Sequence, residues 1–328
     1  MNILIVGAGA VGLVYGRHFA EVGHKVSFFV KAKYQQALED NQQNNGGERL
    51  YLLNKDREQA KPILFDNFNT VTEWNSDTQY DLIVLAISSN ALRALPLENI
   101  KQQLGSNTLL MLQPSQTDFE HLSTIIEPEK IVQGMISLIS YQTPLPNHTY
   151  ADNIPESGIA YYLPPMKMPI SGLDHERAAT VKNLFKGAKI PAKTVSNAVN
   201  ESKLPSAFLM TFLCVLEAAD WKFSTLANSK ELLKKLATGQ QELLPQQVSN
   251  SDSLLDTLKQ GLAKLIIKLV LRPWLYQLLL KISDKAVPLP LEAYLEYHFS
   301  KVREQTKIYM EEYAQSSNEA KKLLDLLE

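Results

Sequence analysis

Short apolar runs alternate with amphipathic segments along the first part of the chain. Runs rich in β-branched residues predict strands, whereas apolar residues three and four positions apart predict helices. The predicted strands cover residues 2–6, 25–30, 81–87, 108–112, 131–139, 159–163 and 192–195, and the predicted helices cover residues 10–22 and 175–185. Such an alternation of strands and helices is typical of an α/β protein with a parallel sheet.

The pattern changes near residue 197, where helical spacing takes over completely. Glycine, which marks turns, also becomes rare, because only Gly239 and Gly261 follow Gly187. The length of 328 residues exceeds the usual size of one domain. We therefore expect two domains, a sheet-containing domain over residues 1–196 and an all-helical domain over residues 197–328.

Three features predict where helices of the second domain begin and end. Pro205 fits the first turn of a helix, and Ser251–Ser253 fit the cap of another. The prolines of the segment Val287–Pro290 predict a turn. A last pair of helices should follow, with an apolar stripe that runs from Leu291 to Tyr309.

The strongest motif lies directly after the first predicted strand, at the start of the first predicted helix. Its residues are Gly7, Ala8, Gly9, Ala10, Val11 and Gly12. In a G-x-G-x-x-G motif the first glycine allows a tight turn and the second lets the backbone approach a pyrophosphate. The third lets the helix pack close to the strand. The helix N-terminus then offers amide groups to the phosphates. The first domain is therefore predicted to be a Rossmann dinucleotide-binding domain.

The end of the second strand distinguishes between dinucleotides. NAD-dependent proteins usually carry an acidic residue there, which binds the ribose 2′-hydroxyl. This chain has Lys31 and Lys33 at that place and no carboxylate before Glu39. Two ammonium groups would neutralise a 2′-phosphate, so we predict NADP(H); the alternative is that both lysines are simply solvated. The missing acid also disfavours FAD.

Composition and charge exclude several other classes of protein. A net charge of −2 gives no electrostatic reason to expect a nucleic acid or an anionic membrane as partner. The single cysteine, Cys214, permits no intrachain disulfide and suits a reducing environment, so we expect a cytoplasmic protein. The sequence contains no spacing of histidines and cysteines that is typical of a metal site, so no metal is predicted.

The apolar segment 254–282 is the other candidate for contact with a partner. Lys264, Lys268, Arg272 and Pro273 interrupt it, so no membrane span is predicted. A core helix, a cover over the active site or a subunit interface is expected, and contact with a membrane surface is the alternative. Because helical second domains often form dimers, a homodimer is one expected assembly.

These features together resemble the ketopantoate reductase (2-dehydropantoate 2-reductase) family over nearly the whole chain. The resemblance rests on the opening segment 2–12, Lys31 at a usual arginine position, the strand 81–87, Leu112-Gln113, Lys203-Leu204 and the C-terminal segment 302–306. It implies an NADPH-dependent reductase that converts a small 2-oxo acid or related carbonyl compound to the hydroxy compound.

The resemblance also assigns roles to individual residues. Ile87, Ser88, Gln113 and Ser115 fall in the cofactor site, and Lys203 falls at the catalytic lysine. An ammonium group there would polarise the carbonyl and supply the proton during reduction. By itself, a lysine close to Pro205 reads as an exposed loop residue.

Several family positions carry other residues in this chain. Ser88 replaces a lysine, Pro114 an asparagine of the cofactor loop, and Lys307 a C-terminal glutamate. Ala207 and Thr211 replace two substrate-binding asparagines. The alternative hypothesis is therefore a catalytically reduced NADP(H)-binding protein that acts as a sensor or structural partner. A third hypothesis, a hydroxyacyl-CoA or 6-phosphogluconate type of dehydrogenase, lacks the expected pair of catalytic residues.

Overall fold

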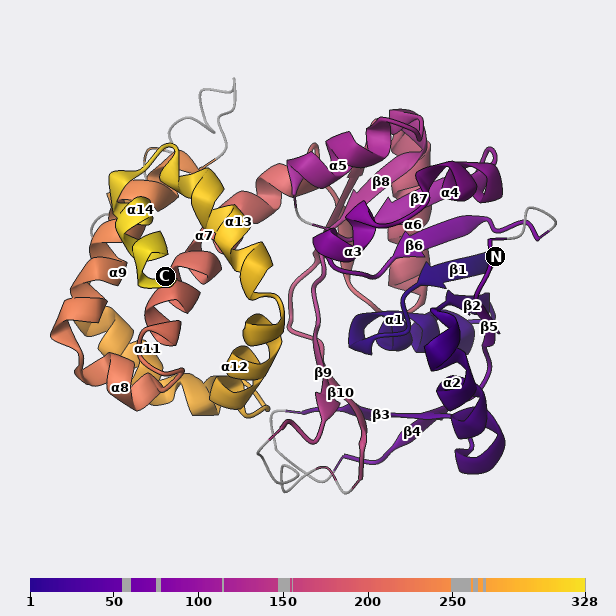
Figure 1. Cartoon of the computed structure of the whole chain (residues 1–328), viewed down its shortest axis with the longest axis horizontal. Helices are drawn as coiled ribbons and strands as arrows, with labels where there is room; N and C mark the ends of the chain where they lie inside the picture. Colours follow the sequence, from indigo (N-terminus) through magenta and orange to yellow (C-terminus); the bar gives the residue numbers. More distant parts are fainter. Residues whose placement is uncertain are drawn as a thin grey trace. The chain divides into compact units, whose positions relative to one another are not determined.

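Figure 1 shows the computed structural model of the chain, in which two compact units follow one another. The structure describes residues 1–54, 60–74, 78–113, 115–146, 154, 156–248, 261, 265–267 and 270–327. The units are Met1–Val199 and Asn200–Glu328. The sequence-based boundary lies after residue 196, within the last few residues of the first unit.

The first unit is built on an eight-stranded sheet. In spatial order its strands are β12 (Ala192–Thr194), β11 (Met168–Gly172), β8 (Ile131–Gly134), β7 (Thr108–Met111), β6 (Leu82–Leu85), β1 (Asn2–Val6), β2 (Lys25–Phe29) and β5 (Asn69–Val71). The strands from β5 to β8 are all parallel, with β1 in the middle, whereas β11 is antiparallel to β8. This strand order is that of the Rossmann fold.

Helices cover both faces of this sheet (Figure 1). They are α1 (Ala10–Glu21), α2 (Ala32–Asn45), α3 (Ser89–Arg93), α4 (Leu97–Leu104), α5 (Gln116–Ser123) and α6 (His175–Gly187), with a 3-10 turn η1 (Pro128–Lys130). Because side chains alternate along a strand, Ile3 and Ile5 of β1 pack with α1 and α6. Leu4 and Val6 pack in a separate core with α3, α4 and α5. Apolar residues on both faces explain the continuous apolar run of β1.

A second, four-stranded sheet corrects one of the predicted strands and contains another. It consists of β4 (Ile63–Phe65), β3 (Glu48–Leu52), β10 (Gly158–Tyr162) and β9 (Ile139–Thr143). The predicted strand 131–139 is therefore wrong as one element, because β8 and β9 belong to different sheets. The strand predicted at 159–163 lies in the second sheet as well. An apolar run indicates that a strand is buried, but it does not indicate which strand pairs with it.

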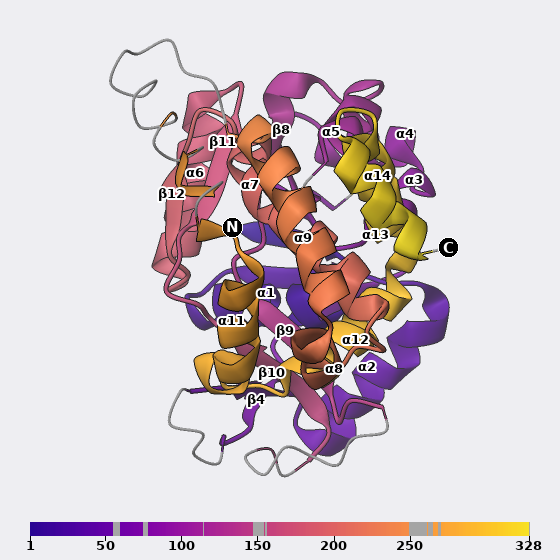
Figure 2. The ribbon, with the colours of Figure 1, turned by 90° about the vertical axis from the view of Figure 1, so that its left-hand side faces the viewer.

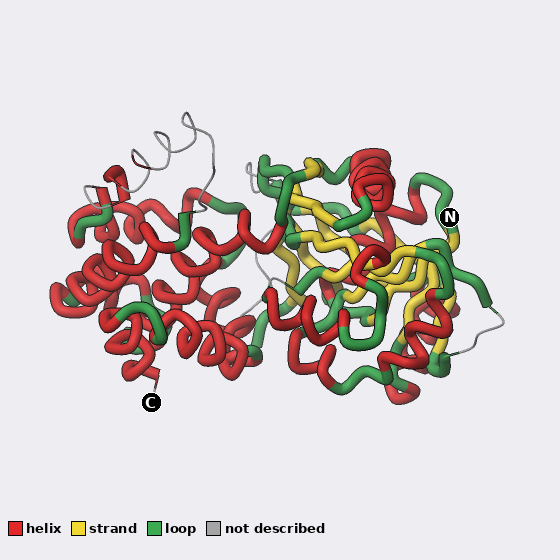
Figure 3. The backbone as a smooth tube through the Cα atoms, turned by 90° about the horizontal axis from the view of Figure 1, so that it is seen from above, coloured by secondary structure: helices red, strands yellow, loops and turns green. Residues whose placement is uncertain are grey.

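Within the described residues, the second unit contains helices and no strands (Figure 3). They are α7 (Ala198–Glu217), which begins two residues before the unit boundary, α8 (Phe223–Asn228), α9 (Lys230–Leu243), α11 (Pro273–Ala286), α12 (Leu291–Lys301), α13 (Arg303–Ala314) and α14 (Asn318–Leu324), with the 3-10 turns η2 (Leu244–Gln246) and η3 (Asp325–Leu327). The all-helical prediction is confirmed. Cys214 lies in the core of this unit, and burial raises the pKa of its thiol to about 12.

Two details of the helical prediction were wrong. Helix α7 begins at Ala198, so Pro205 lies inside the helix and not in its first turn. The early start is stabilised by tertiary contacts, because the backbone amide of Ala198 donates to Ser171 Oγ at 2.8 Å and Val199 packs near Met135. Three helices, not two, follow the predicted turn, since the chain leaves helical geometry at Val302.

The predicted helix that begins after Ser251–Ser253 falls largely outside the described residues. The structure describes helix in this stretch only at residues 261, 265–267 and 270, before α11. None of the described helices is long and apolar enough to cross a bilayer.

Candidate functional site

The glycine motif forms the turn between β1 and the N-terminus of α1. Gly7 has a φ of +105°, a backbone conformation that favours glycine, and a Cβ there would lie 2.8 Å from the carbonyl oxygen of Ala86. A Cβ at Gly12 would overlap the carbonyl oxygen of Gly7. These two glycines thus have the turn and packing roles that the sequence predicts.

Gly9 differs from both neighbours, because the space around it is open. It is exposed, and a Cβ added there would meet no atom of the structure within 4 Å. Its φ of −79° is ordinary, so backbone strain does not explain the glycine. Open space above a glycine at a helix N-terminus is what the close approach of a pyrophosphate requires.

The first turn of α1 has the electrostatics of an anion site. Gly9 is the N-cap residue, no side chain of the described residues caps the helix, and no acidic residue lies in its first turn. The amide groups at the start of this twelve-residue helix, before that of Leu13, are therefore available to a phosphate. Gly7 precedes the helix, and its amide is not available to a phosphate, because it donates to the carbonyl oxygen of Phe29 at 3.0 Å. Gly7 serves the turn, and the later residues of the motif offer the amides.

Lys31 and Lys33 follow β2 at the same carboxyl edge of the sheet. Lys31 is the extended N-cap residue of α2, and both lysines are exposed. Lys33 Nζ lies 4.7 Å from the ring centroid of Tyr34, a cation–π distance. In the described part of the chain, neither ammonium group forms an ion pair. Glu39 accepts hydrogen bonds from Gln35 and Thr70, at 2.8 and 2.9 Å.

Gln113 connects the ends of β6 and β7, directly behind the glycine turn. Its Nε2 donates to the carbonyl oxygens of Leu85 at 3.2 Å and Ile87 at 2.6 Å. Its Oε1 accepts from the amide of Leu112 at 3.2 Å. Ile87 in turn lies against Gly7. The side chain of Gln113 thus holds the loop after β6 in place. It would contribute to a cofactor site by positioning this loop.

Ser88 and Ser115 begin the two helices that follow β6 and β7. Ser88 Oγ accepts from the amide of Ala91 at 3.3 Å and caps α3. Ser115 Oγ accepts from the amide of Thr117 at 3.2 Å and caps α5. Both hydroxyls therefore have a local structural role at this edge. Pro114, which precedes Ser115 in the sequence, lies outside the described residues.

A buried carboxylate between α3 and α5 was missed by the sequence analysis. Asp118 is completely buried, and its Oδ2 accepts a hydrogen bond from Ser89 Oγ at 2.7 Å. Its Oδ1 pairs with Arg93 Nη2 at 2.8 Å. Asp118 thereby ties together the two helices that begin at Ser88 and Ser115. An acidic residue three positions after a capping serine was the only signal in the sequence.

Lys203 lies on α7 with an exposed side chain, whereas Ala207 and Thr211, four and eight residues later, are completely buried. Thr211 Oγ1 donates to the carbonyl oxygen of Ala207 at 2.7 Å. It accepts from Gln240 Nε2 at 2.9 Å, and Gln240 Oε1 accepts from the hydroxyl of Tyr276. The two residues at the family's asparagine positions therefore belong to the core of the helical unit.

The C-terminal segment 302–306 contributes an ion pair to the same unit. Arg303 Nε lies 2.6 Å from Glu217 Oε1 and connects α13 to the end of α7. Lys307 Nζ lies 4.0 Å from Glu304 Oε1, one turn away on α13. Among the described residues, histidine, cysteine and carboxylate side chains form no group that could hold a metal ion.

The first unit thus brings all of the predicted cofactor residues to the carboxyl edge of one sheet. These are Gly7, Ala8, Gly9, Ala10, Val11 and Gly12 after β1, Lys31 and Lys33 after β2, Ile87 and Ser88 after β6, and Gln113 and Ser115 after β7. In doubly wound folds, ligands bind at this edge, where the strand order reverses. Lys203 belongs to the helical unit.

The solved structures that resemble this chain do so at low sequence identity. The ternary structure of D-mandelate dehydrogenase with NADH and anilino(oxo)acetate is 15% identical, with a TM-score of 0.61 over 100% of this chain and 97% of that chain. The 2-dehydropantoate 2-reductase from Geobacter metallireducens GS-15 is 15% identical, with a TM-score of 0.62 over 100% and 99%. The probable 2-dehydropantoate 2-reductase from Bacillus subtilis is 15% identical, with a TM-score of 0.55 over 100% and 99%. These similarities show a shared fold through both units.

No curated protein matches the sequence. The family model described as Ketopantoate reductase PanE/ApbA matches residues 3–155, which include the glycine motif and the parallel strands of the Rossmann sheet. Residues 3–155, just under half of the chain, are thus similar to the ketopantoate reductase PanE/ApbA family.

Proposed function

We propose that this protein is an NADPH-dependent oxidoreductase that reduces a small 2-oxo acid or a related carbonyl compound to the hydroxy compound. The observation that carries the proposal is the uncapped N-terminus of α1, with open space over Gly9 and the cations of Lys31 and Lys33 after the neighbouring strand. The match of residues 3–155 to a reductase family model and the NADH in the similar D-mandelate dehydrogenase structure support a nicotinamide dinucleotide.

Each group in the proposed site has a distinct task. The amides of the first turn of α1 bind the pyrophosphate, and the ammonium groups of Lys31 and Lys33 bind the 2′-phosphate. When bound, the reduced nicotinamide supplies the hydride. Lys203 stabilises the negative charge that develops on the carbonyl oxygen and donates a proton to it.

The choice between NADPH and NADH is tested by removing the two cations. We expect the double variant Lys31→Ala/Lys33→Ala to bind NADPH at least about tenfold more weakly, because hydrogen bonds to charged groups contribute about 1.5–3 kcal/mol. Its affinity for NADH should stay unchanged. Fluorescence titration of both cofactors measures this difference.

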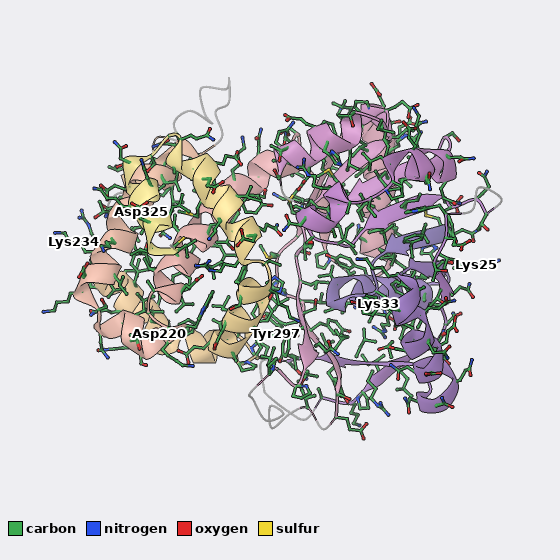
Figure 4. The ribbon with its side chains drawn as sticks, in the orientation of Figure 1. Lys25, Lys33, Asp220, Lys234, Tyr297 and Asp325 are labelled. Carbon is green, nitrogen blue, oxygen red and sulfur yellow. The ribbon has the colours of Figure 1, made fainter. Side chains whose placement is uncertain are left out.

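The matched control is Lys25→Ala, since Lys25 is an exposed lysine at the opposite end of β2 (Figure 4). This variant should bind NADPH as the wild-type chain does. Equal losses for NADH and NADPH in the double variant would refute the assignment of the lysines to the 2′-phosphate.

Catalysis is tested at Lys203. We expect Lys203→Ala to lower kcat for NADPH oxidation by at least about 100-fold across a panel of 2-oxo acids, the usual contribution of a positioned proton donor. The affinity for NADPH should remain that of the wild-type chain. If Lys203→Ala reduces 2-oxo acids as fast as the wild-type chain does, Lys203 takes no part in the chemistry.

A second candidate function is favoured by the burial of Ala207 and Thr211 in the helical core. It is a catalytically reduced protein of the same fold that binds NADP(H) as a sensor or structural ligand. Tight NADPH binding by the wild-type chain with no turnover over the whole panel would favour this candidate. The cytoplasmic location and a homodimer remain predictions, which cell fractionation and analytical ultracentrifugation test.

A further inference from the structure

Helix α11 has apolar side chains on both of its faces. Tyr276 and Leu280 on one face are buried where the helix packs against α8 and α9 (Figure 2). On the other face, Trp274, Leu278 and Ile282 recur every four residues and remain 62%, 49% and 47% exposed. A solvent-facing stripe of this kind needs an explanation, because exposed apolar patches mark interaction sites.

The stripe continues into the segment before the helix and carries cations at its margins. We name this surface the α11 face; its described members are Leu265, Ile266, Val270, Arg272, Trp274, Leu278, Lys281 and Ile282, and all of them are exposed. The apolar members are available for burial against a partner, and Arg272 and Lys281 supply positive charge.

The sequence around this face concentrates charge of one sign. Residues 259–285 contain six cations, Lys259, Lys264, Lys268, Arg272, Lys281 and Lys285, and one anion, Asp284, which gives 6 − 1 = +5. The whole chain has a net charge of −2, so the remainder carries −7. Among its described members, the α11 face itself contains the cations Arg272 and Lys281 and no anion, so an anionic partner that accepts apolar side chains fits it.

We propose that the α11 face binds peripherally to the surface of an anionic lipid bilayer. A helix with leucine and tryptophan on one side and lysine or arginine beside them lies in the plane of the interface, with its apolar side chains among the acyl chains. Trp274 matches the preference of tryptophan for the headgroup region. The cations of Arg272 and Lys281 meet the negative surface.

The charge argues against a second copy as the occupant. In a two-fold contact the same patch meets itself, so Arg272 and Lys281 would share one interface with the same cations of the second copy. Lysine is also depleted in protein–protein interfaces. The proposal does not depend on the reductase activity, because the α11 face shares no residue with the proposed cofactor site or with Lys203.

The experiment uses the full-length chain and vesicles of phosphatidylcholine, with or without phosphatidylglycerol. We expect flotation with the anionic vesicles, none with the neutral ones, and loss of binding as salt is raised. The fluorescence emission of Trp274 should shift to the blue on binding, and Trp274→Phe, which leaves two tryptophans, should abolish the shift. Equal flotation with both kinds of vesicle, or none with either, overturns the proposal.

Matched variants separate this face from other exposed residues. Arg272→Glu and Lys281→Glu should each weaken binding at least about fivefold, the value for one cation near a membrane surface. Lys234 is an exposed residue of α9 in the same unit (Figure 4). Lys234→Glu makes the same charge change there and should weaken binding less. Leu278→Glu/Ile282→Glu should abolish flotation, whereas Ile308→Glu, at an exposed isoleucine of α13, should preserve it.

Circular dichroism establishes that each variant is folded. The salt dependence of vesicle binding by the wild-type chain tests the proposal without any variant. A dimer that forms without lipid, is disrupted by Leu278→Glu and does not float with anionic vesicles would show that a second copy occupies the face. That outcome would overturn the lipid assignment.

Discussion

His18 in α1 is a buried titratable side chain in the Rossmann unit. Its Nδ1 donates to the carbonyl oxygen of Ala188 at 3.0 Å, and the ring of Tyr161 meets it edge to face at 5.8 Å. Its Nε2 is buried without a hydrogen-bond partner among the described residues. Burial, followed by repulsion from Arg17, lowers the pKa of His18 below its ordinary value of 6.5. The folded state therefore holds this imidazole neutral.

This burial predicts a pH dependence of stability. Below about pH 6.5 the unfolded chain takes up a proton at His18 that the folded chain does not. The free energy of unfolding should thus fall as pH decreases below that value and be independent of this group above it. In urea unfolding followed from pH 7.5 to pH 5, His18→Gln should reduce the slope, whereas His175→Gln, at an exposed position, should leave it unchanged. An unchanged slope in His18→Gln would contradict the account.

The sequence predicted the structural roles of some residues described above and not those of others. Gly7 and Gly12 were predictable, because a local motif encodes both the turn and the packing. Asp118 was not, since its partners Ser89 and Arg93 lie 29 and 25 residues away and only the fold brings them together. The same holds for Thr211, whose burial depends on a helix that follows much later in the chain.

At the scale of elements, apolar periodicity predicted the core strands and missed the polar helices. Strand β1 and helix α1 were found because most of their buried residues are apolar. Helix α2 was not predicted, since Leu38 is its only buried residue and its pattern has no apolar face. The start of α7 was placed too late, because proline is a strong local signal and the contacts that extend the helix to Ala198 are tertiary.

Helices α7, α9 and α11 are joined by the hydrogen bonds among Thr211, Gln240 and Tyr276. All three residues are buried, so loss of one partner leaves a polar group without water. Tyr276→Phe should therefore destabilise the helical unit by about 1–3 kcal/mol in urea unfolding. Tyr297→Phe, which removes a hydroxyl bonded to Lys301 at an exposed site, should change stability by less than about 0.5 kcal/mol. Equal effects of the two substitutions would show that the buried network adds no stability.

At the scale of the whole molecule, each unit has a hydrophobic core of its own. The cores of the Rossmann unit and of the helical unit share no residue, and every predicted nucleotide contact belongs to the first. A ligand stabilises only the unit that binds it, provided that the units unfold separately. The two cores therefore predict two thermal transitions that respond differently to NADPH.

Differential scanning calorimetry of the full-length chain tests this expectation. At a free NADPH concentration of about 100 Kd, the transition of the Rossmann unit should gain about 2.7 kcal/mol and move to higher temperature. The other transition should stay in place, and Tyr276→Phe identifies it, because that substitution lowers the Tm of the helical unit alone. If NADPH raises the transition that Tyr276→Phe lowers and leaves the other unchanged, the nucleotide binds the helical unit and the proposed site is wrong. If both move together, the two cores unfold as one cooperative unit.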